Sequence, residues 1–300
     1  MRIALVGAVE STLCAMRAMI DADCELALVA TLTPDLAKRH SDFVDLAPIA
    51  KEHGVDLIGV RNINDDTAID AFRKAAPDYI FVVGWSQICR EEFMNIAPGK
   101  VIGYHPAPLP RMRGRAVLPW TIINDEKISG ATMFWMDGGV DTGDILEQRF
   151  FHVAPRETAR TLYDKHMAAL DAMTRGAIAE LSSDNPRREK QDEACATFAA
   201  RRRPSDGRIN WHRPAEEIDR LIRAVGRPYP GASCDYDDGQ LTIWQARPLP
   251  NTVHHGTIGQ IVAMTDDTFD IVTGDGLLRA EEWDVSGTKP VRMHAVLGGS

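Results

Sequence analysis

The sequence predicts an α/β fold: a Rossmann-like, open and mostly parallel sheet with helices on both faces, followed by a small C-terminal β-barrel domain of OB-like type. Three observations support this fold class. The N-terminal part alternates apolar runs with segments of helical spacing, a polar stretch interrupts this pattern, and short apolar runs separated by turns follow. At 300 residues the chain is about twice as long as a typical domain.

The N-terminal alternation begins with an apolar strand at residues 3–8, a helix at 11–20 and a second strand at 26–31. Strand, helix and strand in this order indicate parallel pairing. The pattern continues with helices near 44–53, 65–75 and 90–95 and strands at 56–60, 79–84 and 101–104. The first turn reads GAVEST and lacks the GxGxxG series, which argues against a dinucleotide site. In such a sheet the ligand crevice lies beyond the carboxyl ends of the strands.

The second half of the chain predicts a change of architecture. A strand at 147–151 and a long amphipathic helix at 158–181 precede the polar, charged segment 182–195. We therefore predict two domains, 1–190 and 191–300. The second is predicted to hold a helix at 215–225 and strands at 241–246, 256–262 and 269–272, with the turn spacing of a small barrel or sandwich.

Composition excludes several classes of protein. With 44% hydrophobic and 26% charged residues, the chain is an ordinary globular protein rather than a disordered or fibrous one. No apolar run approaches the roughly 20 residues that span a bilayer, so we expect a cytoplasmic protein without a membrane partner. The five cysteines are scattered, which indicates reduced thiols. A net charge of -9 argues against nucleic acid as a partner unless a basic patch is formed locally.

Two segments depart from ordinary scaffold composition. The first, GYHPAPLPRMRGRAVLPW at 103–120, fixes His105 in an extended, proline-rich loop directly after a strand. A lone histidine is more often structural, but this rigid position suits a catalytic group. The second, FWMDGGVDTGDILEQ at 134–148, is either a plain acidic turn or a loop that brings a carboxylate to His105.

These segments carry a family resemblance. The motifs HPAPLP, RGRA and MDGGVDTGDI, with GWSQICREEF before them, occur in the order and spacing of the folate-dependent formyltransferases. That family includes methionyl-tRNA formyltransferase, glycinamide ribonucleotide transformylase and the amino-sugar formyltransferases. The resemblance implies formyl transfer from 10-formyltetrahydrofolate to an amine, without a metal. It assigns His105 as the acid/base group and Asp141 as its charge partner, because an ionised carboxylate favours the imidazolium form.

The sequence departs from the family at Gly103. The family motif is Asn-x-His, and its asparagine donates a hydrogen bond to the oxyanion, whereas this chain reads Gly103-Tyr104-His105. Loss of one such donor costs about a hundred- to a thousandfold in rate. Ser86, Gln87 and Asn124 are polar substitutes from neighbouring loops. The alternative is a folate-binding homologue that is non-catalytic or regulatory.

The resemblance also implies binding residues. Backbone groups of two loops would bind the edge of the pterin, Met94 would pack on its face and Arg115 would lie beside the folate. For the substrate we predict Arg113 and Trp120; the alternative for Arg113 and Arg115 is a solvated loop pair. The cofactor residues implied in this way are Ser86, Gln87, Ile88, Cys89, Met94, Arg115, Asp137, Gly138, Gly139, Val140 and Asp141.

The amine substrate is predicted from the RGRA loop and the domain junction. Both resemble the amino-sugar nucleotide N-formyltransferases, such as the enzyme that formylates UDP-4-amino-4-deoxy-L-arabinose. The acidic net charge argues against tRNA, but the junction is locally basic and keeps methionyl-tRNA as an alternative. Its arginines include Arg201, Arg202, Arg203, Arg208, Arg213, Arg220, Arg223 and Arg227. The sequence carries no signal for the oligomeric state.

Overall fold

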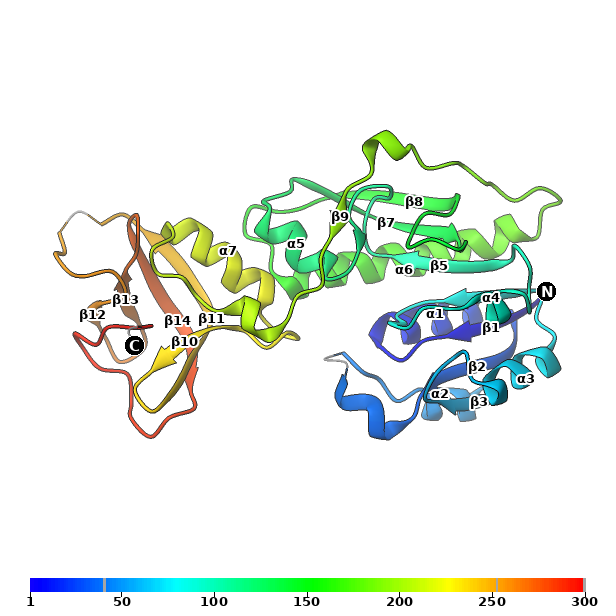
Figure 1. The fold of residues 1–300 in the computed structure, drawn as a ribbon, viewed down its shortest axis with the longest axis horizontal. Helices are drawn as coiled ribbons and strands as arrows, with labels where there is room; N and C mark the ends of the chain where they lie inside the picture. The colour runs from blue at the N-terminus through cyan, green and yellow to red at the C-terminus, as the bar shows by residue number, and fades with distance from the viewer. Residues whose placement is uncertain (40–41, 252, 299–300) are drawn as a thin grey trace. The chain divides into compact units, whose positions relative to one another are not determined.

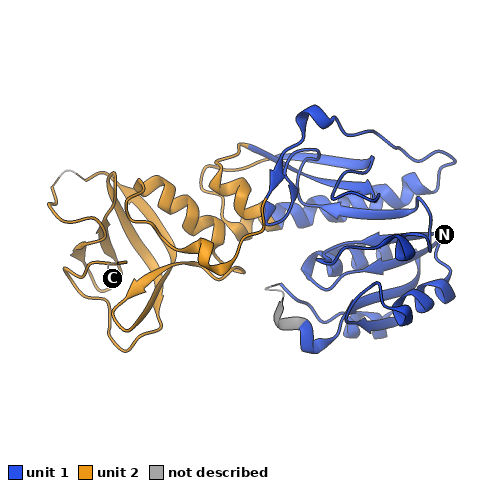
Figure 2. Ribbon diagram, in the orientation of Figure 1, with its two compact units in different colours: residues 1–117, 128–151, 164–199 blue, residues 118–127, 152–163, 200–300 orange. Residues whose placement is uncertain are grey.

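The computed structural model describes residues 1–39, 42–251 and 253–298. Its Cα atoms group into two compact units (Figure 2). Unit 1 holds 1–117, 128–151 and 164–199, and unit 2 holds 118–127, 152–163 and 200–300. Unit 2 therefore includes two excursions from the N-terminal half of the chain in addition to its C-terminal part. The single domain boundary at 190/191 stays a prediction.

Unit 1 is built on a twisted sheet of seven strands within the described residues, in the order β3-β2-β1-β4-β5-β7-β8 (Figure 1). The strand pairs from β3 to β5 are parallel, and β5 pairs antiparallel with β7. This confirms the mostly parallel sheet. The strands are β1 (Arg2–Val6), β2 (Glu25–Leu32), β3 (Leu57–Val60), β4 (Tyr79–Val82), β5 (Val101–His105), β7 (Ile128–Trp135) and β8 (Ile145–His152).

Helices cover both faces of this sheet because its strands are apolar on both sides. In β1, Ile3 and Leu5 belong to one buried cluster, while Ala4 and Val6 belong to another on the opposite face. The first cluster takes in side chains of α1 (Glu10–Asp21), α2 (Ala47–Glu52) and α6 (Ala159–Leu181). The second takes in side chains of α3 (Asp66–Ala75) and α4 (Glu91–Met94).

The strand order reverses between β1 and β4, and ligands of open α/β sheets bind at such a point. Gly7, just after β1, is required by close packing: a Cβ there would lie 2.0 Å from the carbonyl oxygen of Val83. That oxygen accepts a hydrogen bond of 2.7 Å from the Thr12 hydroxyl. The two strand ends are thereby held together, and the loop that follows β4 begins at a fixed place.

Unit 2 contains a five-stranded antiparallel sheet in the described residues, with α7 (Ala215–Val225) packed against β11. Ile218 and Ile222 on α7 are buried. The strand expected at 256–262 begins only at Ile261, after Gly259 adopts a left-handed backbone. The sheet order is β10 (Ala232–Tyr236), β11 (Gly239–Leu249), β14 (Leu277–Val285), β13 (Phe269–Val272) and β12 (Ile261–Met264). Across the described parts of both units, no helix has the length and apolarity needed to cross a membrane.

Candidate active site

His105 is the last residue of β5, and only 5% of its surface is exposed. Its Nε2 lies 2.8 Å from the carbonyl oxygen of Met112. A carbonyl can only accept a hydrogen bond, so this contact places a hydrogen on Nε2. The other ring nitrogen, Nδ1, lies 3.5 Å from Oδ2 of Asp141. The structure therefore brings the two predicted catalytic residues together.

The proline-rich loop after His105 is held by hydrogen bonds to side chains of β7 and β8. Thr132, which lies opposite His105 in the β5–β7 register, donates to the Ala107 carbonyl at 2.7 Å and accepts from the Leu109 amide at 3.1 Å. The side-chain amide of Gln148 on β8 donates to the Leu109 carbonyl at 2.8 Å. Neither Thr132 nor Gln148 was identified from the sequence, because their partners are backbone atoms that are brought near only by sheet pairing.

Asp141 is held in a left-handed backbone conformation, with φ +56°. Its Oδ2, the oxygen that faces His105, accepts a hydrogen bond of 2.8 Å from the Gly114 amide. Met112, whose carbonyl meets the other side of the His105 ring, is also left-handed, with φ +58°. Such backbone conformations are uncommon for residues other than glycine and often occur at functional sites. Both partners of His105 are thus positioned by unusual backbone.

Arg113 does not face solvent, because only 2% of its surface is exposed. Its guanidinium makes a bidentate pair with Glu193, at 2.8 and 2.6 Å, and two contacts to the Gln191 side-chain oxygen, at 3.1 and 2.8 Å. The Glu193 hydrogen bonds raise the pKa of Arg113, and those from Arg113 lower the pKa of Glu193. Arg113 therefore links residues 191 and 193 to the loop that follows His105, and its contact with the substrate stays a prediction.

Gly103 lies two residues before His105, on the same face of β5. A Cβ at this position would lie 2.7 Å from Cζ of Phe134 and 3.1 Å from Cγ of Met136. Phe134, the residue opposite Gly103 on β7, is almost fully buried. Its ring thus occupies the space that the side chain of the family asparagine would enter, and an exchange at position 103 alone would cause a collision.

The loop after β4 is held by contacts to the segment that follows β3. The Gln87 side chain donates to the Arg61 carbonyl at 2.8 Å and accepts from the Ile63 amide at 3.1 Å. Asn64 accepts from the Arg90 amide at 2.7 Å and donates to the Ile88 carbonyl at 2.9 Å. The next residue, Asp65, occupies the N-cap position of α3. Gln87 is therefore engaged in shaping the loop, which leaves it poorly placed to replace the missing oxyanion donor.

Other predicted cofactor residues differ widely in exposure. Ile88 is 76% exposed, whereas Cys89 beside it is buried, and this burial raises the pKa of its thiol to about 12. Met94 packs at the margin of a buried cluster. Arg115 is exposed, and its guanidinium lies 3.4 Å from the carbonyl of Ser86. Arg115 thus meets the loop that carries Ser86, and its place beside the folate stays a prediction.

The acidic loop before Asp141 is shaped by Asp137. One Asp137 oxygen accepts from the Gly139 amide at 3.0 Å and from the Thr142 hydroxyl at 2.7 Å. A Cβ on Gly139 would lie 2.0 Å from that hydroxyl oxygen, so the turn requires a glycine. Gly138 and Val140 are exposed, and Val140 is exposed by 60%. The turn therefore presents backbone and one apolar side chain to its surroundings.

Trp120 belongs to unit 2 and is tied down within it. Its indole nitrogen donates to the Ala200 carbonyl at 2.8 Å, and the Arg202 guanidinium lies 4.8 Å from the centre of its ring. Burial lowers the pKa of Arg202. The predicted substrate contact of Trp120 stays a prediction. In both units, the described His, Cys, Asp and Glu side chains form no group of three or more that could hold a metal ion.

The structure combines an open α/β sheet, with His105 and Asp141 paired at the end of β5, and an antiparallel β unit. The chain belongs to the formyltransferase family. Residues 11–174 match the family described as formyl transferase, and residues 202–300 match the formyl transferase C-terminal domain. His105, Asp141 and Gly103 all lie in the first matched range.

Solved structures with the same fold include sugar and tRNA formyltransferases. WlaRD, a sugar 3N-formyl transferase crystallised with dTDP and 5-N-formyl-THF, gives a TM-score of 0.69 at 18% identity, over 94% of this chain and 97% of that chain. An N-formyltransferase from Helicobacter canadensis, in complex with folinic acid and dTDP-3-aminofucose, gives 0.68 at 18% identity, over 94% and 99%. Methionyl-tRNA formyltransferase from Clostridium thermocellum gives 0.61 at 22% identity, over 82% and 93%.

Proposed function

We propose that this enzyme transfers the formyl group of 10-formyltetrahydrofolate to the amine of a nucleotide-linked amino sugar. The observation that carries the proposal is the His105–Asp141 pair, set in the formyltransferase motifs at the end of β5. The sugar substrate is supported by two structural neighbours with dTDP in their complexes, each matched over nearly its whole length. The net charge of -9 also suits a small substrate better than tRNA.

The described residues fit a folate donor. A pterin is a flat heterocycle whose faces need apolar cover and whose edge needs hydrogen bonds. Ile88 and Val140 are large apolar side chains that remain mostly exposed in the structure, one in each of the two loops assigned to the pterin. The Asp137–Thr142 contact holds the second loop in a turn whose glycines leave its backbone accessible. When bound, the donor supplies the activated formyl group.

The hydrogen bonds of His105 indicate which of its atoms exchanges a proton. Nε2 donates to the Met112 carbonyl, so Nδ1 is the nitrogen left to accept a proton from the attacking amine. Asp141 lies 3.5 Å from Nδ1 and would stabilise the positive charge that the ring gains. The Gly114 amide fixes the Asp141 oxygen in this position. In this mechanism the amine nitrogen bonds to the formyl carbon and gives its proton to His105, and His105 would pass that proton to the donor nitrogen as the bond from that nitrogen to the formyl carbon breaks. Asp141 orients the His105 ring and stabilises its charge.

One observation favours a second candidate function. Residue 103 is a glycine and has no side-chain donor for the oxyanion. The apolar ring of Phe134 fills the space beside it. A homologue that binds folate without turnover would have this feature. An active enzyme remains the better supported function, because Asp141 and the Met112 carbonyl both contact the His105 ring. Both residues adopt left-handed backbone, which is unfavourable and often retained at functional sites.

The test is to incubate the full chain with 10-formyltetrahydrofolate and a panel of nucleotide-linked amino sugars, with methionyl-tRNA included. We expect tetrahydrofolate release that depends on one amino sugar. Binding of 5-formyltetrahydrofolate without release by any amine would establish the non-catalytic function. Release with methionyl-tRNA alone would overturn the proposed substrate, and a steep loss of that activity with salt would indicate phosphate contacts.

A further inference from the structure

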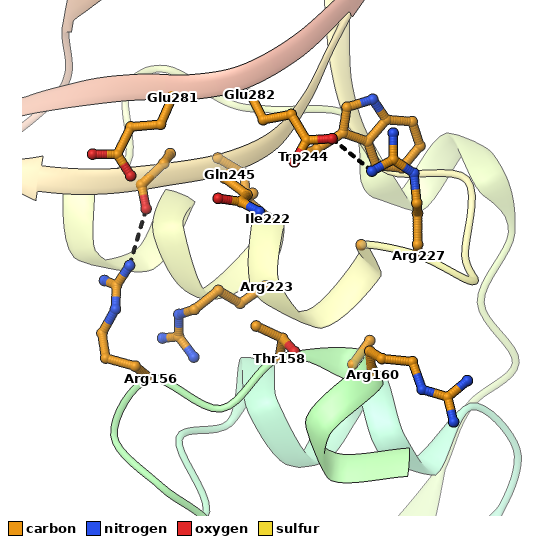
Figure 3. Close-up of a pocket in the computed structure, with 13 residues that line it drawn as sticks. Arg156, Thr158, Arg160, Ile222, Arg223, Arg227, Trp244, Gln245, Glu281 and Glu282 are labelled. Carbon is orange, nitrogen blue, oxygen red and sulfur yellow. Dashed lines mark hydrogen bonds and ion pairs between the residues drawn. The ribbon is translucent and has the colours of Figure 1, made fainter. Parts of the chain in front are cut away.

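Unit 2 contains a cavity of about 350 Å³ that is separate from the residues assigned to formyl transfer. The segment before α6, the end of α7 and the strands β11 and β14 all contribute to its walls (Figure 3). This volume lies within the range of small-molecule sites. Its lining contains four arginines and two glutamates: Arg156, Arg160, Arg223, Arg227, Glu281 and Glu282. Together with Asp219, which contacts two of these arginines, the carboxylates leave one positive charge in excess, and this excess favours an anionic ligand.

Two of these arginines are fixed by one buried carboxylate. Asp219 is only 1% exposed, and its Oδ2 accepts from Arg156 at 3.0 Å and from Arg223 at 2.8 Å. Because one carboxylate cannot neutralise two guanidinium groups, this cluster keeps a positive charge. Arg156 also donates to the Ala246 carbonyl and Arg223 to the Glu157 carbonyl. The two guanidinium groups are therefore held in place before any ligand arrives.

The start of α6 adds to the same wall. Thr158, Ala159 and Arg160 line the cavity, and the Thr158 hydroxyl accepts from the Thr161 amide at 3.2 Å as a helix cap. The N-terminus of this 23-residue helix carries a partial positive charge. Figure 3 shows Thr158 beside Arg223, with Arg160 directed away from the centre. Helix end and guanidinium groups thus favour an anion on one side of the cavity.

The opposite wall offers different chemistry because the β11–β14 ladder is irregular there. Gln245 pairs with Glu282 across the ladder, and the register shifts on both sides of this pair. Trp244 on β11 and Glu281 on β14 therefore have no residue opposite them. Such bulges redirect side chains and are common beside binding sites. Arg227 pairs with Glu282 at 2.6 Å and lies 4.4 Å from the centre of the Trp244 ring, while Glu281 pairs with Arg247 at 2.8 Å. This wall can accept hydrogen bonds from hydroxyl or amino groups.

We propose that this cavity is a second ligand site, which binds a small phosphate-bearing molecule that also carries hydroxyl or amino groups. The phosphate lies toward Arg156, Arg223 and the start of α6, and the polar remainder lies toward Glu281 and Gln245. The site lies wholly in unit 2, so its occupancy does not depend on the chemistry proposed for His105.

The test is calorimetric titration of the full chain with glucosamine 6-phosphate, inorganic phosphate and glucosamine. We expect saturable binding of both phosphates, tighter for glucosamine 6-phosphate, and none for glucosamine. Arg156→Gln should weaken phosphate binding about tenfold, as expected for loss of a charged hydrogen bond. Arg208→Gln removes an equal charge in unit 2 outside the cavity and should change it less than about twofold. His105→Ala should leave it unchanged, which separates this site from the proposed function.

Glu281→Gln gives a prediction of opposite sign. Removing this negative charge should strengthen the binding of inorganic phosphate and reduce the preference for glucosamine 6-phosphate. The proposal is overturned if neither glucosamine 6-phosphate nor inorganic phosphate binds at millimolar concentration, or if Arg156→Gln and Arg208→Gln act equally. Thermal unfolding of each variant checks that it folds. An Arg156→Gln variant that unfolds early is replaced by Arg156→Lys, which keeps the charge but loses the planar fork and should still weaken binding.

Discussion

The side-chain amide of Gln191 donates to the backbone carbonyl of Asp141 at 2.9 Å. The same nitrogen lies 2.7 Å from the Gly143 carbonyl, and the Gln191 side-chain oxygen accepts from buried Arg113. One side chain therefore links the loop that carries Asp141 to the loop that follows His105. Residue 191 lies outside both matched family ranges, 11–174 and 202–300.

Replacement of Gln191 should lower turnover with little effect on substrate affinity. Gln191→Ala removes both donations to the Asp141 loop, and we expect kcat to fall at least about tenfold while KM stays within about threefold. Gln191→Glu would keep an acceptor for Arg113 but cannot donate to carbonyls, so it should not restore kcat. Steady-state kinetics measure both effects. Gln240→Ala, an exposed glutamine in unit 2, is the control and should behave as the parent. Full activity of Gln191→Glu would contradict the positioning role.

Position 103 should accept a side chain only when Phe134 is reduced. Gly103→Asn alone places its Cβ against the Phe134 ring, and we expect about 1–3 kcal/mol loss in the free energy of unfolding. Phe134→Ala alone should also destabilise, because it leaves a cavity. The double variant should lose less than the sum of the two, since each change relieves the other. Urea unfolding of the four proteins measures this coupling, and strict additivity would show that the two side chains do not compete.

The activity of the double variant bears on the missing donor. If the absent oxyanion donor limits the rate, Gly103→Asn with Phe134→Ala should turn over faster than Phe134→Ala alone. A slower double variant would show that another group already serves the oxyanion.

Asp141→Asn should separate the charge of Asp141 from its backbone conformation. Asparagine tolerates left-handed backbone and can still accept from the Gly114 amide, so the thermal midpoint should change little. Its neutral side chain cannot stabilise a protonated His105, and we expect kcat to fall about a hundredfold or more. Asp141→Ala should lose both activity and stability. Near-normal kcat in Asp141→Asn would remove the carboxylate from the mechanism.

The stability of unit 1 should depend on pH through His166. Burial lowers the pKa of His166 to about 3, against an ordinary value of 6.5. Between these values the unfolded chain binds a proton that the folded chain does not, so stability is lost as pH falls below about 6.5. The slope attributable to this one group is at most about 1.4 kcal/mol per pH unit. Urea unfolding from pH 8 to pH 5 should show a weaker dependence in His166→Gln. An unchanged dependence would assign the effect to other groups.

The sequence predicted two long helices, one at the end of the α/β part and one in unit 2, because their apolar periodicity is strong. The helix expected at 158–181 is observed as Ala159–Leu181, and the helix expected at 215–225 is Ala215–Val225. Both helices are amphipathic, and the apolar residues of the pattern are those on the buried face. The short expected strand at 256–262 is displaced, because Gly259 favours a turn that a hydropathy pattern does not register.

Site residues could be predicted where the chemistry of the side chain itself defines the role. They could not be predicted where the role depends on contact with backbone that is distant in the sequence. His105 and Asp141 could be paired from motifs, and the structure brings them together. Thr132, Gln148 and Gln191 act on carbonyls that are far away in sequence, so no local pattern reveals them. Arg113 was predicted to contact the substrate, with a solvated loop position as the alternative, and the structure shows its guanidinium buried and paired with Glu193.

The segment that follows α6, residues 182–199, belongs to unit 1 and contacts its strands. The Arg188 guanidinium lies 3.6 Å from the centre of the Trp135 ring, and the backbone of Glu189 pairs with that of Ile145. Further along, β9 (Phe198–Ala199) pairs with β6 (Arg113–Gly114). A fragment that stops at residue 174, where the first family match ends, would retain His105 and Asp141 but lack Glu193, the carboxylate that pairs with the Arg113 guanidinium. The first family match ends at residue 174, but unit 1 extends to residue 199.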